Sequence, residues 1–93
     1  MEILGEIERI IAERRECPKE GSYVSSLLRE GEDKILEKIG EEATELIIAS
    51  KNSEREAVVS EATDLIFHLL VLLGYKGISL EEIETEFVKR RHP

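Results

Sequence analysis

The two segments that decide the fold are GEEATE, residues 40–45, and EATD, residues 61–64. Each segment contains a pair of carboxylates at i, i+3 spacing, and side chains at this spacing lie on one face of a helix. The two pairs are Glu42 with Glu45, and Glu61 with Asp64. The fifteen residues between the pairs are enough to end one helix, turn and begin another. We therefore expect two antiparallel helices that bring four carboxylates together.

Four carboxylates at one place repel one another unless a cation compensates them. Mg²⁺ is a hard cation that takes oxygen ligands of this kind. The alternative is a solvated acidic face, since 37% of the residues are charged. Glu61 and Asp64 favour the metal interpretation because they interrupt a very apolar helix, where an unpaired acid costs free energy.

Composition predicts one all-α domain over residues 1–93. Leu, Ile, Glu, Lys, Arg and Ala dominate, and these residues favour helix. The net charge of −8 argues against nucleic acid as a partner. The single cysteine, Cys17, indicates a reducing compartment, and we expect the cytoplasm. The apolar run from Leu65 to Leu73 is too short to span a membrane, and the acidic N-terminus does not suit a signal peptide.

About five helices are predicted from apolar periodicity and from helix start and stop signals. The expected helices cover residues 2–15, 22–30, 32–50, 54–74 and 79–91, with turns at 51–53 and 75–78. Ser22 is the expected N-cap of the second helix. Ser79 with Glu82 forms an expected capping box for the last.

The third and fourth helices are each expected to bury one apolar stripe. On the third helix the stripe comprises Ile35, Leu36, Ile39, Ala43 and Leu46, and on the fourth Val58, Ala62, Leu65, Leu69 and Leu72. The acids border these stripes. Lys34 and Lys38 flank the acids, either in helical ion pairs with Glu41, Glu42 or Glu45 or as phosphate ligands.

The segment LIFHLLVLLG, residues 65–74, is apolar nearly all round. Such a helix is buried on every side, and a domain this small can hardly surround it. We therefore expect a helical bundle that is completed by dimerisation. His68 is interpreted as a packed or hydrogen-bonded histidine, with an orienting role toward Asp64 as the alternative.

These motifs resemble a known family. GEEATE followed by EATD is similar to the EExxE…ExxD signature of the all-α NTP pyrophosphatase (MazG-like) superfamily. Residues 22–50 and 61–86 are similar, more specifically, to the phosphoribosyl-ATP pyrophosphatase family. Val24, Thr63 and Phe67 depart mildly from the family pattern, and none of them removes a carboxylate.

The resemblance implies Mg²⁺-dependent hydrolysis of 1-(5-phosphoribosyl)-ATP to 1-(5-phosphoribosyl)-AMP and pyrophosphate, the second step of histidine biosynthesis, by a homodimer. The metal ligands would be Glu42, Glu45, Glu61 and Asp64. Glu41 would be a ligand or a base that orients water, acting with Glu42 and Glu45 in catalysis. Lys34, Lys38, Ser22 and Tyr23 would bind substrate, with a helix cap and core packing as alternatives for the last two.

Two other functions fit the same residues. The first is a house-cleaning pyrophosphatase that acts on dUTP, dCTP or a damaged nucleotide through the same metal site. The second is a helical dimerisation module that binds no metal. The sequence does not define the number of metal ions, the base, or any association with the cyclohydrolase of the next step.

Overall fold

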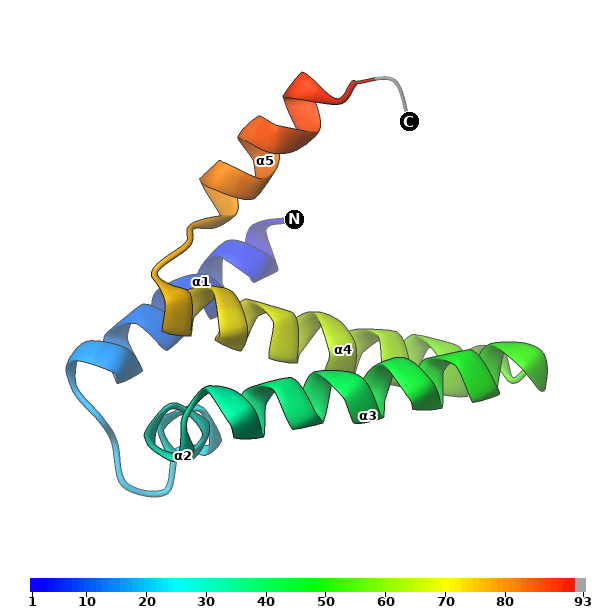
Figure 1. Ribbon diagram of the computed structural model, residues 1–93, viewed down its shortest axis with the longest axis horizontal. Coiled ribbons are helices and arrows are strands. Elements are labelled where there is room, and N and C mark those ends of the chain that lie inside the picture. Colours follow the sequence, from blue (N-terminus) through cyan, green and yellow to red (C-terminus); the bar gives the residue numbers. More distant parts are fainter. Residues whose placement is uncertain (92–93) are drawn as a thin grey trace.

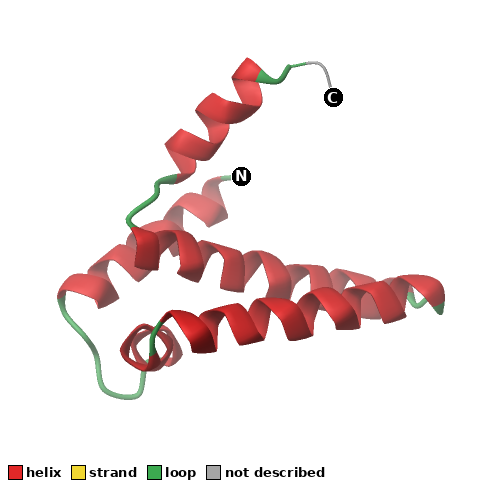
Figure 2. Cartoon of the chain, viewed as in Figure 1, coloured by secondary structure: helices red, strands yellow, loops and turns green. Residues whose placement is uncertain are grey.

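A computed structural model describes residues 1–91, and within them it contains helices and loops without any strand (Figure 2). The helices are α1 (Glu2–Glu16), α2 (Tyr23–Glu30), α3 (Glu32–Lys51), α4 (Arg55–Lys76) and α5 (Leu80–Lys89). The predicted all-α fold with five helices is confirmed.

Helices α3 and α4 form a long antiparallel hairpin, joined by the short turn after Lys51 (Figure 1). An ion pair between Lys76 and Glu32 joins the end of α4 to the start of α3. The antiparallel arrangement brings the middle of α3 beside the middle of α4. It therefore places the two acidic motifs next to each other, as the sequence predicts.

Helices α1 and α2 cover the other end of the hairpin, near the C-terminal half of α4 (Figure 1). The core joins residues from α1, α2, α3 and α4: Ile11, Val24, Leu27, Ile35, Leu70 and Val71. Gly74 permits a close approach of α1 to α4, because a Cβ at this position would overlap the side chain of buried Ile11.

Local capping fixes where the shorter helices begin. The Ser22 side chain accepts a hydrogen bond from the Ser25 backbone N–H, 3.1 Å. Ser79 and Glu82 form the predicted capping box. The Leu80 backbone N–H also donates to Glu8 of α1, 2.7 Å, so the start of α5 is attached to α1. Both predicted caps are confirmed.

Two predicted helix ends were wrong by about two residues. Helix α4 continues through Tyr75 to Lys76 and ends at Gly77, which adopts the left-handed conformation (φ 72°, ψ 26°). Gly74, the predicted end of this helix, instead permits the close contact with Ile11 of α1. Helix α5 ends at Lys89 rather than near Arg91.

The predicted apolar stripes were also partly wrong. Leu36 and Leu69 are 45% and 39% exposed in this chain. On α4 the buried residues are instead His68, Leu70 and Val71, because α1 and α2 pack against that side of the helix.

Helix α4 is long and apolar enough to cross a membrane by length and composition, with a mean hydropathy of 1.7 over its best 18-residue window. The same test is passed by core helices of soluble proteins. In this chain α4 carries Glu61 and Asp64 near its middle and packs along α3. The criterion therefore does not by itself indicate a membrane-spanning segment.

Candidate metal and catalytic site

Three of the four predicted metal ligands meet between α3 and α4. Glu42 and Glu45 from α3 and Glu61 from α4 each offer a carboxylate oxygen, and these oxygens lie within 4.8 Å of one another. Glu42 and Glu61 are half-buried, whereas Glu45 is more exposed. We call these three residues the carboxylate cluster. Its formation requires both the i, i+3 spacing on α3 and the antiparallel pairing with α4.

Asp64, the fourth predicted ligand, is exposed and lies outside this closest group of oxygens. It is nevertheless near enough for its negative charge to raise the pKa values of both Glu42 and Glu61. All four predicted carboxylates are thus close enough for their charges to interact, and three of them could bind one metal ion together.

The pKa values of Glu42 and Glu61 are both raised above the ordinary value of a glutamate. Hydrogen bonding with Glu45 raises the pKa of Glu61, and burial and the charges of Glu45, Asp64 and Glu42 raise it further. Burial raises the pKa of Glu42, against the opposing effect of His68. Both shifts mean that negative charge at this place is under-compensated by the residues around it.

His68 anchors one side of the cluster. It is 5% exposed, and its Nδ1 lies 2.9 Å from the Asp64 backbone oxygen and 3.3 Å from Glu42 Oε1. Both neighbours accept hydrogen bonds, so in the neutral imidazole the proton belongs on Nδ1. Nε2 then accepts from the Tyr23 hydroxyl, 2.9 Å away. Burial raises the pKa of Tyr23, which keeps the phenol protonated as this donor.

This chain of contacts was only partly predicted. A packed, hydrogen-bonded His68 is confirmed, but the carboxylate it touches belongs to Glu42 rather than to Asp64. The spacing within α4 relates His68 to Asp64 alone, and the contact with Glu42 depends on how α3 and α4 pair. Tyr23 is 49% exposed and therefore does not act as a simple core residue.

The flanking lysines form ion pairs along α3. Lys38 pairs with Glu41 at 3.8 Å, one of the partners expected from the sequence. Lys34 pairs with Glu37 at 3.8 Å, a partner that was not expected. Glu41 is exposed and does not join the cluster. Exposed pairs of this kind contribute little to stability, so they can exchange for a stronger ligand.

Ser22 and Tyr23, the other predicted substrate residues, line one hollow with a volume of about 590 Å³ beside α2. The Ser22 hydroxyl oxygen is already used as the cap of α2. The helix-cap alternative for Ser22 is therefore confirmed, and a contact with substrate stays a prediction.

The donor set suits a hard divalent cation. Glu61 Oε2 is buried and has no hydrogen-bond partner among residues 1–91. Such an oxygen is costly to leave unpaired, and a cation between Glu42, Glu45 and Glu61 would compensate it. Oxygen ligands from carboxylates, with room left for water, are what Mg²⁺ prefers.

Comparisons with known proteins identify relatives over nearly the full chain. Residues 4–92 match the family model described as phosphoribosyl-ATP pyrophosphohydrolase. The phosphoribosyl-ATP pyrophosphatase of Methanocella arvoryzae is 54% identical over 92 residues, which cover 97% of each protein. That of Clostridium acetobutylicum is 52% identical over 96% of this chain and 81% of its own. The histidine biosynthesis bifunctional protein HisIE of Bacillus subtilis is 50% identical over 97% of this chain and 43% of its own length.

The fold and the carboxylate cluster define an all-α protein with an acidic site suited to a divalent metal ion. Within that class, the chain belongs to the phosphoribosyl-ATP pyrophosphohydrolase family. The resemblance found from the sequence, and with it the prediction of an enzyme of histidine biosynthesis, is confirmed at the level of the family.

Proposed function

We propose that this chain hydrolyses 1-(5-phosphoribosyl)-ATP to 1-(5-phosphoribosyl)-AMP and pyrophosphate at the carboxylate cluster. One observation carries the proposal beyond family membership. Three glutamates from two helices bring their oxygens within 4.8 Å of one another, although their mutual repulsion opposes this in the absence of a cation. The reaction breaks one P–O bond of the phosphoanhydride bridge between the α and β phosphorus atoms and adds the elements of water across it.

The cofactor we propose is Mg²⁺, held by Glu42, Glu45 and Glu61, with Asp64 as a further ligand. When bound, Mg²⁺ neutralises charge on the triphosphate oxygens and on the departing pyrophosphate. The buried and unpartnered oxygen of Glu61 supports this choice. The protein's own contribution is to hold the ligands in position, and His68 does this for Glu42 through its Nδ1.

Glu41 and the two lysines lie on α3, the helix that also carries Glu42 and Glu45. We assign Lys34 and Lys38 to phosphate oxygens, for which they would leave the carboxylates that they contact at 3.8 Å. Departure of Lys38 frees Glu41 to serve as a ligand or as the base that orients the attacking water. In phosphoryl transfer, positioning and charge neutralisation of this kind carry most of the rate.

Ser22 and Tyr23 are proposed to contact substrate from the start of α2. Tyr23 lines this hollow, and its hydroxyl is hydrogen-bonded to His68. Substrate bound there would therefore contact the residue that holds His68, which in turn contacts Glu42.

The working unit is proposed to be a homodimer in the cytoplasm. Large apolar side chains are exposed on α4 and α5, among them Ile66 at 41%, Phe87 at 72% and Val88 at 52%. A second copy of the chain that covered them would remove this apolar surface from water. The high apolar content of α4 is explained in the same way.

The test is pyrophosphate release by the purified protein with Mg²⁺, from phosphoribosyl-ATP and from a panel of NTPs and dNTPs. Phosphoribosyl-ATP should be the substrate that is turned over rapidly. Glu45→Gln should reduce turnover about 100-fold or more, because it removes a charged ligand from the cluster. Glu56→Gln, an exposed acid in the first turn of α4, is the matched control and should leave turnover unchanged.

Three outcomes would contradict the proposal. Rapid release of pyrophosphate from a nucleotide of the panel, and not from phosphoribosyl-ATP, would show that the protein is a house-cleaning pyrophosphatase. Near-normal turnover of Glu45→Gln would refute the role of the cluster. No release from any substrate would favour a dimerisation module.

A further inference from the structure

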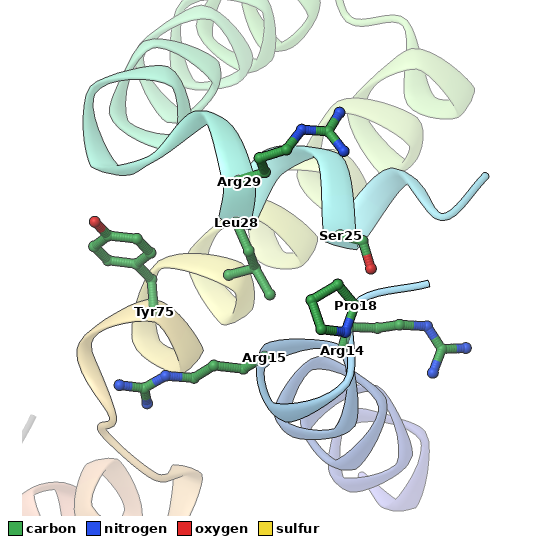
Figure 3. Close-up of a pocket in the computed structure, with 7 residues that line it drawn as sticks. All are labelled: Arg14, Arg15, Pro18, Ser25, Leu28, Arg29 and Tyr75. Atoms are coloured by element: carbon green, nitrogen blue, oxygen red, sulfur yellow. The ribbon is translucent and has the colours of Figure 1, made fainter. Parts of the chain in front are cut away.

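A second concave feature lies away from the carboxylate cluster. It is a cavity of about 580 Å³ between the C-terminal end of α1, helix α2 and the C-terminal end of α4 (Figure 3). Its lining consists of Arg14, Arg15, Pro18, Ser25, Leu28, Arg29 and Tyr75. Tyr75 follows Asp64 by eleven residues on α4, which corresponds to about 16 Å along a helix. We call this feature the arginine cavity.

The arginine cavity concentrates positive charge in a chain whose net charge is −8. Among residues 1–91, Arg15 and Arg29 form no ion pair, and the pair of Arg14 with neighbouring Glu13 is long, at 3.7 Å. Arg15 donates from Nη1 to the Gly74 backbone oxygen, 3.0 Å away, which leaves its charge uncompensated. Three cationic groups around one cavity repel one another, and an anion between them would reverse that effect.

Two polar groups in the cavity wall have unused hydrogen-bond donors. Arg14 Nε is buried and has no partner within the described part of the chain. Ser25 is 6% exposed, and its Oγ accepts from the Lys19 backbone N–H at 2.9 Å. Its own hydroxyl proton has no acceptor among the hydrogen bonds of residues 1–91. Buried donors are nearly always paired in native structures, so both point to an acceptor that the chain itself does not supply.

The apolar residues of the lining indicate that the anionic group belongs to an organic molecule. Leu28, Pro18 and the Tyr75 ring offer apolar surface beside the guanidinium groups (Figure 3). In this view the three guanidinium groups lie around the cavity on different sides, with that of Arg29 above, that of Arg14 beyond Pro18 and that of Arg15 below Tyr75, and the Ser25 hydroxyl lies near Pro18. A cavity of this volume suits a small organic ligand. A phosphate offers several acceptor oxygens and about two negative charges, which match several guanidinium groups better than a single carboxylate does.

We propose that the arginine cavity binds the phosphate monoester of a sugar or a nucleoside. Ser25 and Arg14 Nε bind phosphate oxygens from the cavity wall, the exposed Arg29 side chain turns inward to bind the same phosphate, and Leu28 and Tyr75 contact the organic group. The site needs no metal ion and contains none of the proposed metal ligands.

Two sources could supply this phosphate monoester. Arg29 also lines the neighbouring hollow that contains Ser22 and Tyr23, so the arginine cavity adjoins the hollow that is proposed to hold substrate. The first source is therefore the phosphoribosyl end of the substrate itself, an interpretation that rests on the proposed function. The second source is a separate phosphorylated metabolite that binds beside the active site.

The direct test is calorimetric titration of ribose 5-phosphate into the full-length protein in EDTA, at constant ionic strength. EDTA removes any contribution of the metal site. Wild-type protein should show saturable binding. Arg29→Gln should weaken that binding about tenfold or more, the size expected for loss of a charge-assisted hydrogen bond. Arg29 is exposed, so this variant is not expected to disturb the fold.

Two variants serve as controls in the same titration. Arg55→Gln removes the same charge at the far end of α4 and should bind ribose 5-phosphate like wild type. Glu45→Gln should also bind normally, even though it is expected to lose activity, so failure of the proposed function would be seen separately. Absence of saturable binding, or equal weakening by Arg29→Gln and Arg55→Gln, would overturn the proposal.

Steady-state kinetics then distinguish the two sources. If the substrate supplies the phosphate, Arg29→Gln raises KM for phosphoribosyl-ATP, and ribose 5-phosphate inhibits competitively. If a separate metabolite is the ligand, Arg29→Gln has the same KM for phosphoribosyl-ATP as wild type when no phosphate monoester is added. The effect of the variant is then seen only in the calorimetric titration. Either result supports the site, provided that the calorimetric binding is present.

Discussion

Among single residues, Glu61 shows most clearly that the site carries uncompensated negative charge. Its pKa is raised by hydrogen bonding with Glu45, by burial and by three neighbouring acids, and one of its oxygens has no partner among the described residues. A folded-state pKa above the unfolded value means that Glu61 stabilises the fold below the unfolded pKa. This contribution is lost as the pH rises through the folded value.

We predict that Glu61→Gln raises the melting temperature of the metal-free protein at pH 7.5, because it removes a repelled charge. The difference from wild type should shrink as the pH falls through the raised folded-state pKa of Glu61 toward the ordinary pKa of a glutamate, because Glu61 then becomes protonated in the folded protein. Mg²⁺ should raise the melting temperature of wild type more than that of the variant. Thermal melting in EDTA and in Mg²⁺ across pH 4.5–8 measures both effects. A metal-free variant that melts below wild type at pH 7.5 would contradict this account.

Tyr23 has a structural role that can be separated from any contact with substrate. Its hydroxyl donates to buried His68, so Tyr23→Phe leaves Nε2 without a donor. We expect a loss of about 1 kcal/mol in the free energy of unfolding, even without metal or substrate. Tyr75→Phe is the control, since the Tyr75 hydroxyl makes no hydrogen bond within residues 1–91. Equal stability of the two variants in urea unfolding would leave Tyr23 with a substrate role only.

At the scale of the elements, α4 organises the molecule through its contact with α1. Gly74 lies in the last turn of α4, where a Cβ would overlap buried Ile11. Gly40 lies inside α3, and a Cβ there would meet no atom within 4 Å. The same substitution should therefore have opposite effects at these two helical positions.

Gly74→Ala is expected to destabilise the protein. Overpacking costs about 1–3 kcal/mol, which exceeds the gain in helix propensity of about 1 kcal/mol. Gly40→Ala should instead stabilise it by up to about 1 kcal/mol. Urea unfolding at one fixed protein concentration compares them. A stabilising Gly74→Ala would show that α1 and α4 are not in close contact.

The local signals in the sequence predicted the elements well. The caps at Ser22 and Ser79 depend only on residues three positions away, and the i, i+3 acid pairs depend on one helix each. The sequence therefore predicted the cluster of Glu42, Glu45 and Glu61 once an antiparallel hairpin was assumed. The end of α4 was predicted wrongly at Gly74, because a glycine is needed there for the close packing of Ile11 from α1 and not to end the helix.

Features that combine distant segments could not be predicted in this way. The contact of His68 with Glu42 depends on how α3 and α4 are aligned. Lys34 pairs with Glu37 and not with Glu41, Glu42 or Glu45. Several acids at i, i+3 and i, i+4 spacing compete for one lysine on a helix, and the sequence does not decide between them. The arginine cavity draws on α1, α2 and α4, and nothing in the spacing of Arg14, Arg15 and Arg29 indicates that they meet.

At the scale of the whole molecule, one chain leaves much apolar surface uncovered. Helix α5 contains no buried residue and extends away from the hairpin (Figure 1), while Phe87 is 72% exposed. We predict a sedimentation mass of about twice the 10.6 kDa of the chain at micromolar concentration. A mass that stays near 10.6 kDa throughout that range would refute the dimer.

Glu42, Glu45 and Glu61 are proposed to hold the divalent cation. The most direct measurement is an anomalous difference map from a crystal grown with Mn²⁺, an oxygen-seeking substitute for Mg²⁺. We predict a peak between the carboxylates of α3 and α4, within bonding distance of at least these three side chains. A map with no peak there, or with Mn²⁺ bound only elsewhere on the protein, would contradict it.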